Sequence, residues 1–150
     1  MDKNVKIAKQ LVRIAKMLVS NAGDDIESMS VDEKINLAKN NTTSPEILEK
    51  LAKDEERWVR KAVAENPKTP VELLRKLAGD ENYGVRSTIA YNPNTPAEAL
   101  VKLSEDKERW VRKALAENPK APVEALRKLA EDEDDWVRGF AMHQLRKRGQ

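Results

Sequence analysis

The sequence predicts an all-α protein, a solenoid in which short helix pairs follow one another along the chain. Three observations lead to this fold class. The 150 residues repeat themselves at an offset of 26 residues, each copy carries two apolar stripes at helical spacing, and a copy of this size buries too few apolar side chains to fold alone. Neighbouring copies are therefore expected to share one continuous core.

The four copies occupy residues 40–65, 66–91, 92–117 and 118–143, and with the flanking segments we expect a single solenoid domain over residues 1–150. Leucine, valine, aspartate and arginine recur in register in these copies. The leucines of the first stripe are Leu48, Leu51, Leu74, Leu77, Leu100, Leu103, Leu126 and Leu129.

A second period, of two repeats, lies over the first. Residues 54–78 and 106–130 differ only at Glu55/Lys107, Val63/Leu115, Thr69/Ala121 and Leu73/Ala125. Either the duplication of a two-repeat block or a consensus-type design would produce this pattern.

Each copy is expected to form a first helix at a Thr-Pro pair and a second helix before an Asn-Pro pair. In the run from Thr69 to Glu72, the threonine is the expected N-cap, Pro70 the first helical residue and the glutamate the capping-box partner. The last copy has Ala121 instead and lacks the cap hydroxyl. Asn-Pro ends the second helix because the residue before proline is disfavoured in the α region. A second helix this short is expected to be α or partly 3₁₀.

The recurring pattern Asp-(x)4-Val-Arg-x-x-[Val/Ile/Leu]-Ala-x-Asn-Pro-x-Thr-Pro-x-Glu-x-Leu-x-x-Leu-Ala resembles the leucine-rich repeat variant family, from residue 40 to about residue 142. The resemblance implies a HEAT-like, right-handed solenoid in which α-helices alternate with short or 3₁₀ helices. One member of that family, associated with nitrogen fixation, carries an iron–sulfur cluster on cysteines outside its repeats. This chain has no cysteine, so that cofactor cannot be carried over.

Composition excludes several classes of chemistry. Because the chain has no cysteine, it has no disulfide, thiolate metal site or cysteine nucleophile. Because it has one histidine, metal sites built from several histidines are nearly excluded. The carboxylates all lie in repeated or loop positions and no glycine-rich phosphate loop is present, so we expect no enzyme, no metal and no cofactor. A total of 28 Lys and Arg against 26 Asp and Glu rules out nucleic-acid binding by bulk charge alone, although local patches can still bind.

We also expect neither a membrane span nor a signal peptide in this sequence. No apolar run reaches the roughly 18 residues that a membrane span needs. Lysine and arginine interrupt every apolar run in the first twenty residues, so this segment has no signal-peptide core. We expect a soluble, cytoplasmic protein.

The ends of the chain depart from the repeat. Residues 1–22 are expected to form an amphipathic helix that caps the first repeat and ends at Gly23. Within it, residues 5–19 repeat a seven-residue pattern, so a weak dimer through this helix is an alternative, and binding to a membrane surface is less favoured. Residues 24–39 are expected as a degenerate half-repeat, and residues 144–150 as a solvated basic tail.

One candidate site is a row of aromatic residues near the start of the second helix, with basic residues beside it. These side chains either close gaps between repeats or form a ridge that contacts a partner, since tryptophan and arginine are favoured interface anchors. The row consists of Trp58, Trp110, Trp136, Tyr83, Arg57, Lys61, Arg109 and Lys113.

The second candidate is a row of arginines, each with an aspartate six residues upstream. We expect a structural ladder in which each arginine binds an inter-helix aspartate and nearby carbonyls, as in HEAT-like families. The alternative leaves the arginines free to bind phosphate or carboxylate. The residues are Asp54, Asp80, Asp106, Asp132, Arg60, Arg86, Arg112 and Arg138.

These observations favour a non-catalytic binding scaffold that presents an extended repeat surface to a protein or peptide. The first alternative is a HEAT-like solenoid that binds nucleic acid through the Trp, Arg and Lys stripe, although acidic residues beside that stripe weaken it. The second is a structural or self-assembling subunit that joins through the N-terminal helix.

Overall fold

The computed structural model describes residues 2–19 and 25–150, and the described residues form ten helices and no strand. They fall into two compact units, Met1–Lys68 and Thr69–Gln150. Gly23, the expected end of the first helix, lies outside the described residues. No described helix is both long enough and apolar enough to cross a membrane.

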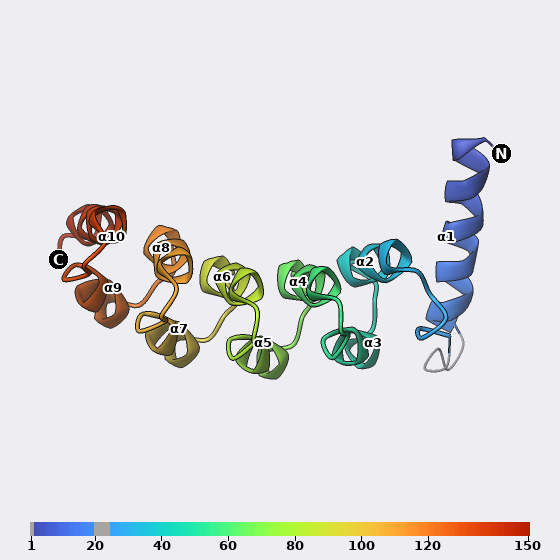
Figure 1. The fold of residues 1–150 in the computed structure, drawn as a ribbon, viewed down its shortest axis with the longest axis horizontal. Coiled ribbons are helices and arrows are strands. Elements are labelled where there is room, and N and C mark those ends of the chain that lie inside the picture. Colours follow the sequence, from blue (N-terminus) through green and yellow to red (C-terminus); the bar gives the residue numbers. More distant parts are fainter. Residues whose placement is uncertain (1, 20–24) are drawn as a thin grey trace. The chain divides into compact units, whose positions relative to one another are not determined.

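The first unit contains four helices (Figure 1): α1 Lys3–Val19, α2 Val31–Lys39, α3 Pro45–Leu51 and α4 Arg57–Glu65. Helix α2 packs against α3 and α4, and α3 packs against α4. The side chains between them are fully buried leucines and valines, among them Leu37, Leu48, Leu51, Val59 and Val63.

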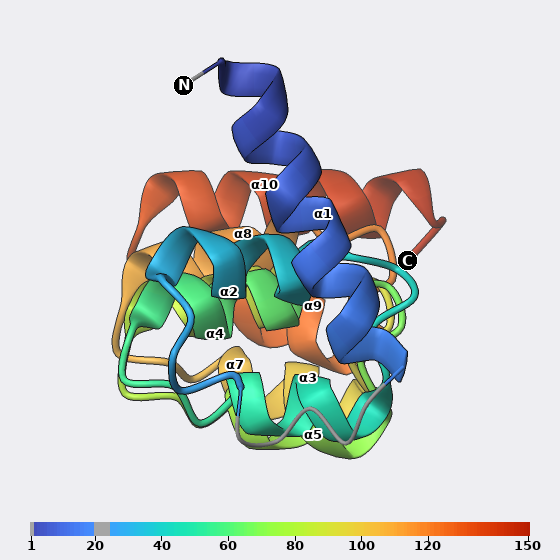
Figure 2. The same ribbon diagram turned by 90° about the vertical axis from the view of Figure 1, so that its right-hand side faces the viewer.

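The second unit contains six helices: α5 Val71–Leu77, α6 Tyr83–Tyr91, α7 Ala97–Leu103, α8 Arg109–Glu117, α9 Val123–Leu129 and α10 Asp135–Lys147. The longer helices α6, α8 and α10 pack side by side in one layer, and the shorter helices α5, α7 and α9 form the other. Figure 2 shows α8 and α10 in the upper layer, with α5 and α7 in the lower one. This packing confirms the all-α solenoid class.

The second helices end where the sequence predicts. Asn66, Asn92 and Asn118 are the C-caps of α4, α6 and α8, and each has an extended backbone before its proline. These three helices are α-helices of nine residues, so the 3₁₀ alternative is not observed in the described part of the chain. A capping box between Ser30 and Glu33 begins α2.

The expected threonine N-caps are wrong. The N-cap of α5 is Pro70 and that of α7 is Pro96, and neither makes a side-chain cap. Thr95 instead donates its hydroxyl to the carbonyl of Ile89 (2.8 Å), and Thr43 does the same to Leu37 (2.6 Å). The buried hydroxyl thus satisfies a carbonyl that the end of the preceding helix leaves open.

Over residues 3–15, where its side chains are described, the N-terminal helix α1 buries few apolar side chains. Ile14 is buried, and Arg13 donates to Glu33 and Ser28 at the start of the half-repeat. The other large apolar side chains described on α1 are exposed: Val5, Ile7, Leu11 and Val12. The side-chain hydrogen bonds of Arg13 are thus made with the half-repeat and not with the first repeat.

The C-terminal segment is more ordered than a solvated tail. Helix α10 continues to Lys147, beyond the expected boundary at residue 143. Arg148 donates to the carbonyls of Ala121 and Pro119, both at 2.6 Å. These contacts anchor the end of the chain to the loop that precedes α9.

Candidate functional site

The arginine row of the second unit forms a ladder between consecutive repeats. Arg86 donates through Nε and Nη2 to the carboxylate of Asp106, at 2.7 and 3.1 Å. Arg112 makes the same fork with Asp132, at the same two distances. In both cases the carboxylate lies twenty residues downstream, in the next repeat. The aspartate six residues upstream contributes its backbone carbonyl, for example that of Asp80 to Arg86 at 2.8 Å.

The row continues on either side of these two forks. In the first unit, Lys34 takes the place of the arginine and binds Asp54 at 2.7 Å. Arg60 donates to the carbonyls of Asp54 and Glu55, both at 2.9 Å. Arg138 donates to the carbonyl of Asp132 at 2.7 Å and pairs with Asp135 of its own helix. The sequence analysis missed Lys34, because only arginines were aligned.

The carboxylates of Asp106 and Asp132 are held ionised. Burial raises the pKa of Asp106, but hydrogen bonds from Arg86 and from the Glu108 N–H outweigh it and hold this pKa below its ordinary value. The same balance, with Arg112 and the Asp134 N–H as donors, lowers the pKa of Asp132. Arg86 and Arg112 are themselves buried. Their charges are therefore used between repeats and not offered to a ligand.

A second ladder, of asparagines, was missed by the sequence analysis. Asn118 is fully buried and donates its amide to the carbonyls of Ala90 and Asn92 at the C-terminal end of α6, at 2.8 and 3.4 Å. Asn66 makes the same two contacts in the first unit, to Ala38 and Asn40. The Asn-Pro pair therefore both ends a helix and joins it to its neighbour.

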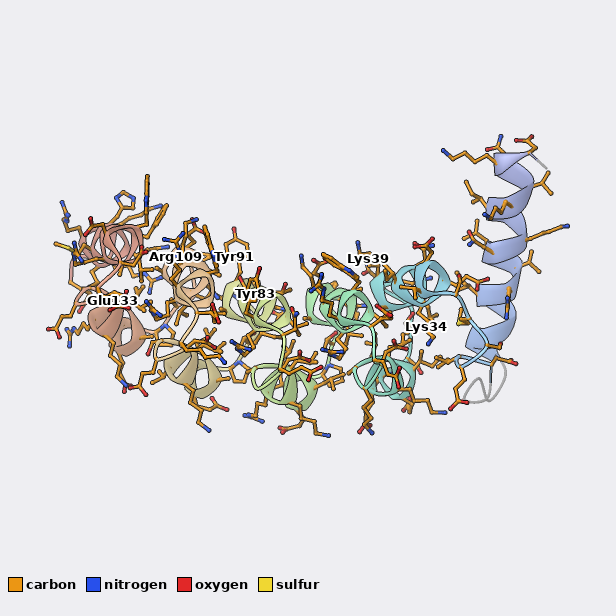
Figure 3. The ribbon with its side chains drawn as sticks, in the orientation of Figure 1. Lys34, Lys39, Tyr83, Tyr91, Arg109 and Glu133 are labelled. Atoms are coloured by element: carbon orange, nitrogen blue, oxygen red, sulfur yellow. The ribbon has the colours of Figure 1, made fainter. Side chains whose placement is uncertain are left out.

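The aromatic row is exposed on the layer of second helices. In the second unit, Tyr83, Trp110 and Trp136 lie at the N-terminal ends of α6, α8 and α10, and Trp136 is 70% exposed. Tyr91 is also exposed at the far end of α6. Figure 3 shows Tyr83 and Tyr91 on α6 and Arg109 on the neighbouring helix α8.

Between α8 and α10, the row opens into a cleft. A cavity of about 330 Å³ lies there, and we call it the aromatic cleft. It is lined by Arg109, Trp110, Lys113, Asp134, Trp136 and Phe140. The volume is at the lower end of the range typical of ligand pockets, and its walls are mainly aromatic, as such pockets usually are.

Two cations lie over aromatic rings of this cleft. The Arg109 guanidinium lies 4.5 Å from the centroid of the Trp110 ring, and the Lys113 ammonium lies 5.2 Å from that of Phe140. Each cation also meets a carboxylate: Arg109 contacts Asp134 at 3.4 Å, and Lys113 contacts Glu117 at 2.8 Å. The aromatic faces are thus held in place by cation–π contacts.

Asp134 also caps the N-terminus of α10. It is the N-cap of α10 and accepts hydrogen bonds from the backbone N–H groups of Trp136 and Val137. The hydrogen bond from Val137 is the main cause that lowers the pKa of Asp134. Because this carboxylate fixes the first turn of α10, it also positions the Trp136 side chain at the cleft.

Trp58 in the first unit has the same local sequence as Trp110 but different residues in the next repeat. Arg57 and Lys61 lie over its ring, at 5.0 and 5.7 Å from the centroid. The residues that correspond in the following repeat to Trp136 and Phe140 are Gly84 and Thr88. Trp58 is therefore a natural control for the cleft.

Of the eight predicted row residues, the structure brings Arg109, Trp110, Lys113 and Trp136 together at the cleft. Phe140 and Asp134 complete it and were not predicted as site residues. The signal for Phe140 was present, since the last copy departs from the repeat at this position. Within the described part of the chain, no group of three His, Asp or Glu side chains could hold a metal ion.

Comparison with known proteins identifies the repeat. The sequence model of the family described as "Leucine rich repeat variant" matches residues 57–82, 83–108 and 109–134, three consecutive stretches that together span more than half of the chain. No curated protein and no solved structure gives a significant match. Repeat families of this kind generally provide interaction or scaffold surfaces. The chain belongs to the leucine rich repeat variant family.

Proposed function

We propose that the protein is a non-catalytic scaffold that binds a protein or peptide segment on the layer of second helices, with the aromatic cleft as its main contact. The observation that carries this proposal is the exposure of Trp110 and Trp136 at the mouth of an apolar cavity. Partly exposed tryptophans beside a pocket are typical of the residues that dominate binding energy in protein interfaces.

The charges favour a protein partner over a nucleic acid. Phosphate binding needs free cations, and its strength depends on how many of them meet the backbone. Two of the basic residues beside the tryptophans are paired with carboxylates of their own helices, Lys61 with Glu65 at 3.9 Å and Lys113 with Glu117 at 2.8 Å, which leaves few cations for a phosphate backbone. The buried arginines of the ladder do not face a ligand.

Selection of binders from a phage-displayed library of random short peptides tests this function. We expect the unaltered chain to enrich a set of sequences. The double variant Trp110→Ala/Trp136→Ala should lose these binders, and the control Trp58→Ala should keep them. Circular dichroism and the melting midpoint of each variant check that the fold is intact. Retention of the binders by the double variant, or no enrichment by the unaltered chain, would contradict the proposal.

A second candidate function is self-association through α1. Its exposed Val5, Ile7, Leu11 and Val12 belong to a seven-residue repeat, which is the spacing that lets a helix pair with a second copy of itself. A weak dimer should appear in sedimentation equilibrium at high concentration and disappear in Leu11→Glu. A strict monomer at all concentrations would exclude it.

A further inference from the structure

We infer that the aromatic cleft selects an acidic segment: an extended stretch of a protein partner with aromatic or large aliphatic anchors and Asp or Glu side chains between them, bound by Arg109. This inference rests on the proposed function and names the chemistry of its partner. It is carried by the hydrogen-bonding state of Arg109, by the cations over the rings and by the spacing of the aromatic row.

Arg109 is the cleft cation with the most donors to spare. Among the described residues, its only hydrogen bond goes from Nη1 to Asp134, at 3.4 Å, which is long for a charged pair. A guanidinium carries five N–H donors in a fixed fork. Stacking on Trp110 holds this fork at the cleft while leaving the side chain about half exposed. Arg109 is therefore arranged to take a carboxylate in a forked contact.

Asp134 does not need Arg109 to remain ionised. Its carboxylate accepts the backbone N–H groups of Trp136 and Val137, and its pKa is lowered mainly by the latter. When Arg109 turns from Asp134 to an incoming carboxylate, this N-cap keeps its own partners. The exchange replaces the 3.4 Å contact between Arg109 and Asp134 with two shorter hydrogen bonds from Arg109 to the ligand carboxylate.

A cationic partner fits the cleft less well. Aromatic cages attract ammonium groups through the faces of their rings. Here the faces of Trp110 and Phe140 are already approached by Arg109 and Lys113. A ligand ammonium would meet two like charges over the rings, whereas a ligand carboxylate would meet the two complementary charges and would have to displace Asp134 from Arg109.

The geometry of the row also sets the spacing of the anchors. Tyr83, Trp110 and Trp136 begin three helices of one layer, with α6 packed on α8 and α8 packed on α10. Packed helices lie about 8–10 Å apart, and an extended peptide advances about 3.3 Å per residue. An extended segment that crosses the layer therefore presents successive anchors about three residues apart. This favours an internal acidic side chain over a free chain end as the source of the carboxylate.

Three peptides, each capped at both ends, test this inference: Phe-Asp-Glu-Phe, Phe-Lys-Lys-Phe and Ala-Asp-Glu-Ala. Each is titrated into the full chain labelled with ¹⁵N, and the indole N–H signals of the three tryptophans are followed by NMR. We expect Phe-Asp-Glu-Phe to shift the signals of Trp110 and Trp136 but not that of Trp58. Peptide concentrations reach about 10 mM, because a ligand with few non-hydrogen atoms binds weakly.

The acidic peptide should bind roughly tenfold more tightly than the lysine peptide, a difference typical of one charge-assisted contact. Arg109→Gln should reduce this preference to less than about threefold, while Arg57→Gln, the matched change beside Trp58, should leave it intact. Phe-Lys-Lys-Phe binding as tightly as the acidic peptide would overturn the inference but leave the cleft as a peptide site. A preference that survives Arg109→Gln, or shifts confined to Trp58, would also overturn it. If no peptide shifts any signal the inference fails, and the library selection then decides the proposed function separately.

Discussion

Replacing Arg86 with alanine is expected to lower the free energy of unfolding of the second unit by about 2–4 kcal/mol. The guanidinium makes two hydrogen bonds with the carboxylate of Asp106 and two with the carbonyls of Asp80 and Glu81. The side chains of the ion pair are only 10% and 8% exposed. Breaking a fully buried pair costs about 3–5 kcal/mol. The lower range is expected here because Asp106 keeps the N–H of Glu108 as a partner.

Urea unfolding followed at the indole signals of single tryptophans measures this loss in the right part of the chain. Trp110 and Trp136 report on the second unit and Trp58 reports on the first. The Arg86→Ala midpoint should fall at both tryptophans of the second unit.

Arg86→Lys is the conservative control, because Lys34 fills the equivalent place in the first unit. It should lose about half as much stability as Arg86→Ala, since a lysine keeps the charge and loses the fork.

A double-mutant cycle with Asp106→Ala isolates the pair. The two single variants should together lose more than the double variant does, with a coupling energy of at least about 1 kcal/mol. An unchanged midpoint in Arg86→Ala, or a coupling energy near zero, would refute the view that this ladder stabilises the stack.

The remaining predictions concern pH, the asparagine ladder and a helical glycine. The pKa values of Asp106 and Asp132 are lowered in the folded protein. Their stabilising contribution is therefore complete above the unfolded pKa of about 3.9 and is lost as the pH falls from there toward the folded values. The free energy of unfolding of Arg86→Ala should depend less on pH in this range than that of the unaltered chain, as measured by acid unfolding. Asn118→Ala should cost about 1–3 kcal/mol in urea unfolding, because it leaves the buried carbonyl of Ala90 without its donor; a loss under about 0.5 kcal/mol would contradict this role. Gly139→Ala should raise stability by about 0.5–1 kcal/mol, since an added Cβ meets no atom within 4 Å in the middle of α10; a lower melting midpoint would count against it.

Much of the fold could be read from local patterns. The Asn-Pro pairs end three helices at the residues expected, because proline restricts the backbone of the residue before it. The capping box at Ser30 forms because both of its partners lie within one turn. In contrast, Thr95 was assigned to the helix after it and bonds instead to Ile89 in the helix before it. The expected partner was a backbone N–H two or three residues after Thr95, and the observed partner is a carbonyl six residues before it. Both lie close along the chain, so sequence spacing alone does not distinguish them.

The candidate site was only partly accessible to sequence reasoning. Trp110 and Trp136 recur at one repeat position and could be found by alignment. Phe140 could not be assigned to the same site from the sequence. It lies one turn after Trp136 on α10, and it reaches Lys113 of α8 only because α8 and α10 pack together. The same is true of the Asn118 amide, whose partners are in the preceding repeat.

The amino-acid sequence by itself determined the repeat period, the helical class and the positions of the buried and exposed rows, because these depend on contacts within a few turns of chain. Tertiary structure alone decided which rows pair with which: that the arginines reach the aspartates of the next repeat, and that Trp110 and Trp136 border a cavity. Both depend on the packing of helices from different repeats, and side chains that meet across such an interface are brought together by distance in space, which a spacing along the chain does not encode.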